Sequence, residues 1–504
     1  MTLVSLRFAR TALIKRLQSP PSTVAPVVAG VLFFIFLALC ARFLSGGSVS
    51  RAVLCLMVAL APPAVYLLVK RPLIFPFACY VCLVPLNAIL FFGHLGTLSK
   101  LLGAMSFIAL ALWLVRHRLV VKPHATTFVW LALTLWIILG GLWAIDRYDW
   151  LGDLTPGGGV GLLTFLELLG LYIVVAAIPV RSIDWNVTCI AVVTGGLIAA
   201  AVSFYQLFVT GGFLSGRLWV TGVGGQVADP NHFAGALLLA IFVTTAAALH
   251  QKAAMAKLAL MLCLCALMCG IFLSGSRDAM IAVAIGFFYM MWRGRYRAQL
   301  AVYALVAGLA AAPMLPALAA RFVLATSDFG AGRLFIWRVG WDALKTYWLL
   351  GAGFNNFPNA FDRSYLHVYM SQATGYQRAG HNLLLTSAVE LGLLGAGLML
   401  LAWVLQFRML KSIDRTSPFY DWRVALEAAL LALFVSCMFL DNMFEKYTWL
   451  TFCVVALFRS RYVTSLNDNV ELAMPREPGC RLPDSDVYRD SAAPWPLTTS
   501  SLDR

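Results

Sequence analysis

Residues 321–390 read RFVLATSDFGAGRLFIWRVGWDALKTYWLLGAGFNNFPNAFDRSYLHVYMSQATGYQRAGHNLLLTSAVE. This stretch is the one long interruption in a chain otherwise made of apolar runs joined by short loops. An irregular polar backbone of this length cannot lie in hydrocarbon, because each unpaired amide or carbonyl costs several kcal/mol there. It is also too rich in Trp, Tyr and Phe for a disordered segment. We therefore expect a folded cap outside a lipid bilayer, and long loops of this kind usually carry function.

The composition places the rest of the chain in a membrane. Of 504 residues, 61% are hydrophobic and 12% are charged, whereas ordinary soluble proteins carry about 25% charged residues. The net charge of +15 does not indicate nucleic acid as a partner, because Lys and Arg lie in short clusters between the apolar runs. The partner that this pattern predicts is the lipid bilayer.

The apolar runs are long enough to cross a hydrocarbon core about 30 Å thick. They predict an all-α fold, a polytopic transmembrane helical bundle of about 12–14 spans with one long extracytoplasmic loop that carries an amphipathic helix. The predicted spans are 25–43, 52–69, 73–92, 98–115, 126–144, 160–180, 187–209, 231–250, 256–274, 278–292, 298–320, 382–407, 424–441 and 446–460.

The distribution of positive charge predicts the orientation. With the amino terminus in the cytoplasm, the inner segments hold 21 Lys and Arg and the short outer loops hold 7. Both termini are then cytoplasmic, and no cleaved signal is visible. The predicted divisions are a cytoplasmic segment 1–23, transmembrane helices 24–320, a large periplasmic loop 321–381, transmembrane helices 382–460 and a disordered cytoplasmic tail 461–504.

The cysteines do not predict a redox or metal site. Ten of the eleven fall within apolar runs, where free Cys is a small buried hydrophobe. Cys79 and Cys82 have the spacing of a redox motif, but they lie in the run LIFPFACYVCLVPL. We predict no disulfide, no metal ligand set and no cofactor.

The first polar candidates lie in the loop GGFLSGRLWVTGVGGQVADPNHFAGALL, residues 211–238. Asp229 and Asn231 flank Pro230, which is first of all the signature of a helix start. Arg217 is the only cation in this loop, so a role in substrate binding stays open beside a structural one.

A second candidate is Arg277, in the tight turn SGSRD between two predicted spans. An arginine at the end of a span often extends to the interface or pairs with a neighbour. Its place on the outer side, against the charge bias, keeps a functional interpretation open.

The third candidate is Arg333, at the start of an amphipathic helix. Free backbone N–H groups, the helix dipole and a guanidinium together favour phosphate. Along this helix Trp337, Trp341, Leu344 and Trp348 form a stripe that is typical of a helix lying along a membrane surface. Arg338 and Asp342 are predicted to pair at a spacing of four.

The fourth candidate is His381, which with Asn382 opens the span after the cap. Such a histidine is often only interfacial, but this one follows a region that holds three arginines. Neighbouring cations lower the pKa of an imidazole, and the neutral ring can accept a proton from a sugar hydroxyl. Glu167, Glu390 and Glu427 lie inside predicted spans, where charge is expensive, and Glu390 is equally a candidate for a helix–helix hydrogen bond.

Taken in order, these motifs resemble the O-antigen ligase and O-antigen polymerase superfamily of bacterial surface-polysaccharide enzymes. The resemblance rests on DPNHFA at a span start, LSGSR at an outer turn, RLFIWR and GAGFNNF in the long outer loop, and HNLLL followed by ELGLLG. It covers roughly residues 200–410.

The resemblance implies an inverting, metal-independent glycosyltransferase at the periplasmic face of the bacterial inner membrane. The donor would be a glycan on undecaprenyl diphosphate, and the acceptor a sugar hydroxyl of lipid A core or of another glycan. Arg277 and Arg333 would hold the diphosphate, with Arg217, Arg338, Asn231 and Asn382 as further substrate-binding residues. His381 would be the base or would orient the acceptor. Polysaccharide export and assembly proteins are further candidate partners.

Three hypotheses remain from the sequence. The leading one is a glycosyltransferase, which is either a ligase or a polymerase. Both kinds of enzyme need the same donor site. The second is a transporter or flippase of a lipid-linked glycan, which would use Glu167, Glu390 and Glu427 as polar sites within the membrane. The third is a structural subunit of an envelope assembly, in which the arginines and the histidine would be replaceable.

Overall fold

The computed structural model describes residues 49–87, 89–90, 97–118, 124–152, 161–209, 211, 213–214, 217–222, 227–312, 332–369, 378–441 and 443–473. The predicted segment 1–23, the predicted span 25–43 and residues 474–504 of the predicted tail lie outside these ranges.

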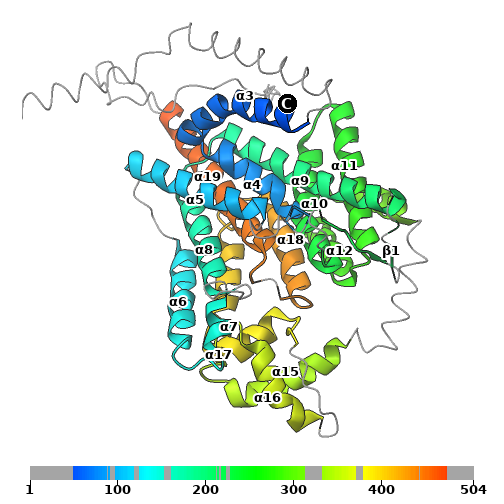
Figure 1. The fold of residues 1–504 in the computed structure, drawn as a ribbon. Helices are drawn as coiled ribbons and strands as arrows, with labels where there is room; N and C mark the ends of the chain where they lie inside the picture. The colour runs from blue at the N-terminus through cyan, green and yellow to red at the C-terminus, as the bar shows by residue number, and fades with distance from the viewer. Residues whose placement is uncertain are drawn as a thin grey trace, which may run out of the picture.

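The described chain is almost entirely helical (Figure 1). Before the cap, the helices are α3 (Val49–Lys70), η1 (Leu73–Phe77), α4 (Ala78–Leu83), η2 (Val84–Leu86), α5 (Leu98–Arg116), α6 (Ala125–Gly140), α7 (Arg147–Leu151), α8 (Leu162–Ala177), α9 (Ser182–Val209), α10 (Pro230–His250), α11 (Ala254–Ser274), α12 (Arg277–Arg293) and α13 (Arg297–Ala311). The cap holds α15 (Arg333–Tyr347) and α16 (Phe357–Val368), and α17 (Leu383–Arg408), α18 (Tyr420–Cys437) and α19 (Lys446–Ala473) follow. The two short strands β1 (Phe213–Leu214) and β2 (Arg217–Leu218) pair antiparallel.

The predicted all-α bundle is confirmed, and each predicted apolar run within the described residues coincides with a helix. The run at 73–92 is broken into η1, α4 and η2, with non-helical backbone at Phe75 beside Pro76. By length and composition, five described helices could each cross a membrane: α5, α9, α10, α11 and α17. A sixth span results if Leu60–Lys70 and Leu73–Leu86, bent by 113°, count as one. The other described helices are shorter or more charged, so the number of 12–14 spans stays a prediction.

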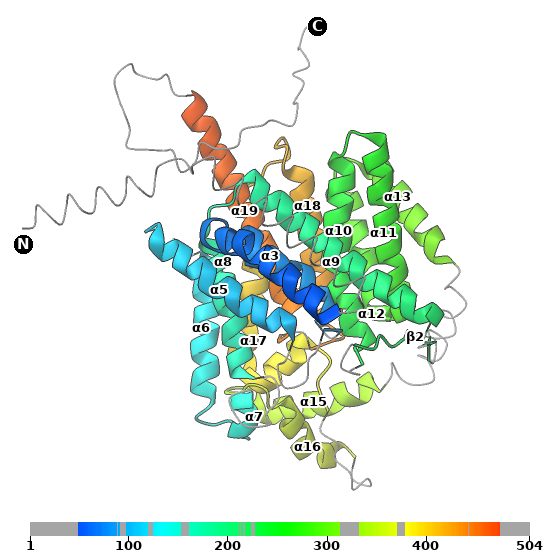
Figure 2. The same ribbon diagram turned by 45° about the horizontal axis from the view of Figure 1, so that its top comes forward.

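Helix α10 is the centre of the bundle. Of the residues in its most apolar part, 89% are buried, because α9, α11, α12, α18 and α19 pack around it. A helix that is apolar on every side is typical of such a core position. Figure 2 shows α10 to α13 on one side of the bundle and α5, α6 and α8 on the other, with α9 crossing between them.

Basic side chains hold distant segments of the chain together at two ends of the bundle. On the face that carries the cap, the Lys446 ammonium donates hydrogen bonds to Asn87, Thr97 and Ser99 at 2.7, 2.8 and 2.9 Å. On the opposite face, the side chain of Arg295 donates to the carbonyl of Ser417 at 2.9 Å, and that of Arg459 to the carbonyl of Met409 at 3.1 Å. The charge bias predicts that this opposite face is the cytoplasmic one.

The cap has a hydrophobic core of its own, separate from the core of the bundle. Its buried members come from α15, α16, the segment between these two helices and the start of α17: Ile336, Val339, Ala343, Ala352, Phe357, Ala360, Phe361, Tyr365, Leu385 and Val389. In Figure 1, α15 and α16 lie together at one end of the bundle beside α17. The long loop is therefore a folded element where the structure describes it.

The structure shows which face of α15 packs against the rest of the cap, while the predicted contact of its Trp stripe with a membrane surface stays a prediction. The buried face is Ile336, Val339, Gly340 and Ala343, whereas Trp341 is 62% exposed and Trp348 is 51% exposed. The predicted pair of Arg338 with Asp342 is wrong. Asp342 instead accepts a hydrogen bond from Lys345 at 2.8 Å and lies 3.5 Å from His367, because α16 brings that imidazole alongside.

The glycine-rich segment after α15 docks onto a break in α17. The N–H of Ala352 donates to the carbonyl of Val389 at 2.8 Å, and that of Gly353 to the carbonyl of Glu390 at 2.9 Å. At the break, Gly392 has a φ of +68°, and a Cβ at this position would overlap the carbonyl oxygen of Leu349. Only glycine allows this conformation and this close approach at little cost.

Two further predictions concern the end of the chain and the cysteines. The tail was predicted to be disordered from residue 461, but α19 continues to Ala473, because the helix extends beyond its apolar part. The eight cysteines whose side chains the structure describes, Cys79 and Cys82 among them, are free thiols.

Candidate functional site

Four helices begin near one another on the cap face, and a polar or charged residue lies at the first position of each or directly before it. They are α10 at Pro230, α12 at Arg277, α15 at Arg333 and α17 at Leu383. Helix starts carry free N–H groups and the positive end of the dipole. A region built from several of them favours negative charge.

Arg333 and Arg277 are brought together at the starts of α15 and α12. Burial lowers the pKa of Arg333, and the neighbouring positive charge of Arg277 lowers it further, whereas Asp278 and Asp229 raise it. The Arg333 guanidinium also lies over the ring of Phe439, 5.8 Å from its centroid. The two cations, 56 positions apart in the sequence, therefore act within electrostatic range of each other.

His381 joins the same region. Burial lowers its pKa, Arg333 lowers it further, and His232 and Arg378 add to this, whereas Asp229 raises it. Burial and the neighbouring cations therefore favour the neutral ring, and the sequence analysis predicted this effect of the cations. His381 also has a φ of +46°, a conformation that is uncommon for a residue with a Cβ and often found at functional sites.

Two carboxylates balance the cations. Asp278 is buried and accepts hydrogen bonds from the hydroxyls of Ser276 and Ser436, at 2.6 and 3.3 Å. Asp229 caps α10, where its carboxylate accepts the N–H of Asn231 at 2.7 Å, so the predicted capping role is confirmed. Both carboxylates stabilise the charged form of Arg333.

Arg217 and Asn231 lie together at the edge of this region. The Arg217 guanidinium donates to the side-chain oxygen of Asn231 at 2.8 Å and to the carbonyl of Ser274 at 3.4 Å. It also lies over the ring of Trp219, 5.3 Å from its centroid. Arg217 thus connects β2 to the start of α10 and to the end of α11.

Asn382 and Arg338 are placed differently from this group. Asn382 caps α17: its side-chain oxygen accepts the N–H of Leu385 at 3.0 Å, and its amide donates to the carbonyl of Met438 at 3.1 Å. It therefore positions the segment that carries His381. Arg338 is exposed on another side of α15, over the ring of Tyr369 at 5.9 Å from its centroid.

The sequence did not point to a second histidine near the site. His232 Nδ1 lies 3.1 Å from the hydroxyl of Tyr447 and 3.5 Å from a carboxylate oxygen of Glu445. An electrostatic interaction also links His232 to His381. The signal was the DPNH motif, in which Asp229 and Asn231 drew attention as capping residues and His232 did not.

The three glutamates of the transport hypothesis do not meet at one place. Glu427 lies toward the opposite face, bonded to Arg423 at 2.9 Å and to the hydroxyl of Tyr289 at 2.7 Å. Glu167 is partly exposed and lies 3.8 Å from Lys100. Glu390 is buried under the cap and accepts the N–H of Phe357 at 3.0 Å.

Comparison with known families gives one match that covers the cap and the helices beside it. Residues 258–400 match the family model described as O-antigen ligase. This confirms the resemblance to the O-antigen ligase superfamily. No curated protein matches the chain.

The O-antigen ligase match runs from α11 to α17 and includes Arg277, Arg333, Arg338, His381 and Asn382. Arg217 and Asn231 precede it. The family supports a multi-pass membrane protein that is a glycosyltransferase of the ligase or polymerase type. Such an enzyme takes a lipid-linked glycan as donor and a glycan as acceptor.

Proposed function

We propose that this protein moves a glycan from undecaprenyl diphosphate to a sugar hydroxyl at the periplasmic face of the bacterial inner membrane. The observation that carries the proposal is the gathering of Arg277 and Arg333 beside a neutral His381, at the starts of three helices. The acceptor is lipid A core if the enzyme is a ligase, or another lipid-linked glycan if it is a polymerase.

In the proposed reaction the acceptor oxygen forms a bond to the anomeric carbon as the bond from that carbon to the diphosphate oxygen breaks. The bonding electron pair leaves with undecaprenyl diphosphate, and the configuration inverts. Arg277 and Arg333 stabilise the charge that develops on this leaving group, which is the kind of electrostatic term that contributes most to many enzymes. The acceptor proton passes to the neutral imidazole of His381. No metal is needed in this scheme, because the guanidinium groups supply the positive charge.

The site carries both positive and negative side chains, which fits a reaction whose diphosphate product must be released. Asp278 and Asp229 face the same guanidinium as Arg277 does, so they offset part of the positive charge. A site of pure cations would hold a diphosphate product tightly. The carboxylates weaken product binding and favour turnover.

The test is a strain in which the gene is disrupted and then complemented with single variants. We expect Arg333→Ala and His381→Ala to insert normally and to lose glycan transfer by about a hundredfold or more. Arg363→Ala is the matched control, because Arg363 is exposed on α16 of the same cap, and it should transfer normally. Normal surface glycan from both site variants would end the catalytic assignment.

The same strain separates the two forms of the proposal. Without a ligase, cells should accumulate unmodified lipid A core, whereas without a polymerase they should display caps of a single repeat. Electrophoresis of the extracted surface glycan distinguishes these outcomes.

A further inference from the structure

The outer side of the cap carries a groove that the proposed transfer site does not use. It has a volume of about 600 Å³ and lies between α15 and α16. Its lining residues are Leu334, Trp337, Arg338, Trp341, Asp342, Lys345, His367 and Val368. Five of them, Leu334, Arg338, Trp341, Asp342 and Lys345, follow one stripe of α15 at helical spacing.

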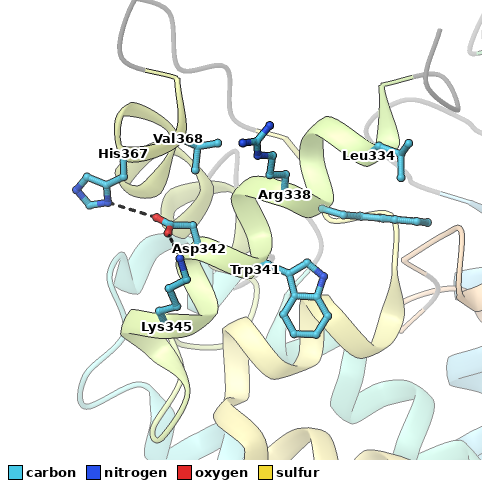
Figure 3. Close-up of a pocket in the computed structure, with 8 residues that line it drawn as sticks. Leu334, Arg338, Trp341, Asp342, Lys345, His367 and Val368 are labelled. Carbon is cyan, nitrogen blue, oxygen red and sulfur yellow. Dashed lines mark hydrogen bonds and ion pairs between the residues drawn. The ribbon is translucent and has the colours of Figure 1, made fainter. Parts of the chain in front are cut away.

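Aromatic and charged groups alternate in this groove. Trp341 is 62% exposed, and the N–H of Trp337 is already donated to the carbonyl of Gly380 at 3.2 Å, so these indoles offer ring surface. Figure 3 shows the Asp342 carboxylate between Lys345 of α15 and His367 of α16. Both ion partners hold that carboxylate in place, and they lower its pKa, Lys345 most strongly.

We propose that this groove binds the polysaccharide chain of a substrate. Sugar rings present C–H faces that stack on indoles, and their hydroxyls pair with carboxylates and guanidinium groups, which form the stronger kind of hydrogen bond. The groove offers both kinds of group on one helix stripe. A membrane surface is the alternative occupant, but four charged or titratable side chains in one small volume disfavour hydrocarbon contact.

The groove lies beside the proposed transfer site, and the inference that one glycan occupies both rests on the proposed function. Arg333 and Trp337 are one turn apart on α15, and both lie against the ring of Phe439. The indole N–H of Trp337 also donates a hydrogen bond to the carbonyl of Gly380, the residue before His381. The stretch of α15 from Arg333 to Lys345 is about 18 Å long. A glycan whose end lies at His381 would therefore run along it over several sugar units.

The experiment measures binding to the full-length protein in nanodiscs. The probe is a fluorescently labelled surface polysaccharide, released by mild acid from cells that express the native protein. We expect Trp341→Ala and Arg338→Ala to weaken binding about tenfold, equivalent to about 1.4 kcal/mol. Trp348→Ala is the matched control, because Trp348 is 51% exposed at the end of the same helix and outside the groove. It should bind as the wild type does.

Equal binding by the wild type and Trp341→Ala would overturn the proposal. A second measurement tests the membrane alternative. The difference in tryptophan fluorescence between the wild type and Trp341→Ala gives the contribution of the Trp341 ring. If nanodiscs of brominated lipid quench that contribution, the ring lies in lipid and the proposal is overturned as well. Arg333→Ala separates this proposal from the proposed function: it should keep polysaccharide binding while losing transfer. If it keeps transfer instead, the catalytic assignment fails, and the Trp341 result still decides the groove.

Discussion

The buried carboxylate of Glu390 accepts a hydrogen bond from the backbone N–H of Phe357 at 3.0 Å. Phe357 is the first residue of α16, so its N–H has no partner within that helix. A side chain of α17 therefore supplies the cap that α16 lacks in its own sequence. This bond, together with the backbone bonds of Ala352 and Gly353, fixes the cap to the bundle.

Glu390→Ala should loosen the cap. The change leaves a buried N–H without a partner, which costs roughly 1–3 kcal/mol. We expect faster cleavage of the cap by added protease in intact nanodiscs, and a lower midpoint of thermal unfolding. Glu167→Ala is the matched control, because Glu167 is partly exposed and pairs only at 3.8 Å with Lys100, and its effect should be small. Equal protease resistance of the wild type and Glu390→Ala would contradict this role.

Gly392→Ala should destabilise the protein. The new Cβ would meet the carbonyl oxygen of Leu349, and the φ of +68° is unfavourable for alanine. Gly397 of the same helix has open space around its Cβ position, so Gly397→Ala should be neutral or stabilising by about 0.5–1 kcal/mol. Thermal unfolding of the two purified variants makes the comparison. Similar midpoints would show that the break in α17 does not require glycine.

Asn356→Ala should separate the cap from the turn before α7. Asn356 is fully buried, its side-chain oxygen accepts the N–H of Asp146 at 2.8 Å, and its amide donates to the carbonyl of Asp146 at 3.0 Å. Losing both bonds should cost roughly 1–3 kcal/mol. Asn359→Ala, at a less buried position, should cost less. Unfolding measured by denaturant titration ranks the two, and the reverse order would show that Asn356 does not connect these segments.

The pH dependence of transfer should report on His381. Its pKa lies below the ordinary value of 6.5, because burial and then Arg333 disfavour the charged ring. The neutral base is present at neutral pH and is lost only as the pH falls through this lowered pKa, so activity should persist to mildly acidic pH. Transfer rates of the purified enzyme between pH 5 and pH 8 (about the range in which histidine titrates) measure this fall in activity, the acid limb of the pH profile.

Arg378→Gln sharpens that test. Arg378 also lowers the pKa of His381, so removing its charge should raise that pKa and move the acid limb to higher pH. Activity at pH 8 should stay near that of the wild type. A limb that moves to lower pH, or does not move, would mean that a group other than His381 sets it.

Local pattern was enough to predict the helices of the bundle. Apolar runs of sufficient length form helices, because the backbone satisfies its own hydrogen bonds within each run. The run at 73–92, broken beside Pro76, is the exception. The start of α15 at Arg333 was predicted in the same way, and so was the cap on α10 at Asp229. A glycine before Arg333 and an Asp-Pro pair are signals within a few residues.

The tertiary structure decided how the polar residues are used. In the sequence, Asn356 is one residue of the motif GAGFNNF. The fold places it against Asp146, which is 210 positions away. Asn231 was expected to belong to a helix start or to bind substrate, and the fold places it against Arg217, from which it accepts a hydrogen bond. Glu390 was expected to be either a charge inside a span or a helix–helix hydrogen-bond partner, and it accepts a hydrogen bond from the start of α16. Sequence spacing specifies which face of a helix a residue occupies, but the partner on that face comes from a distant segment, and only the packing of the helices brings the two together.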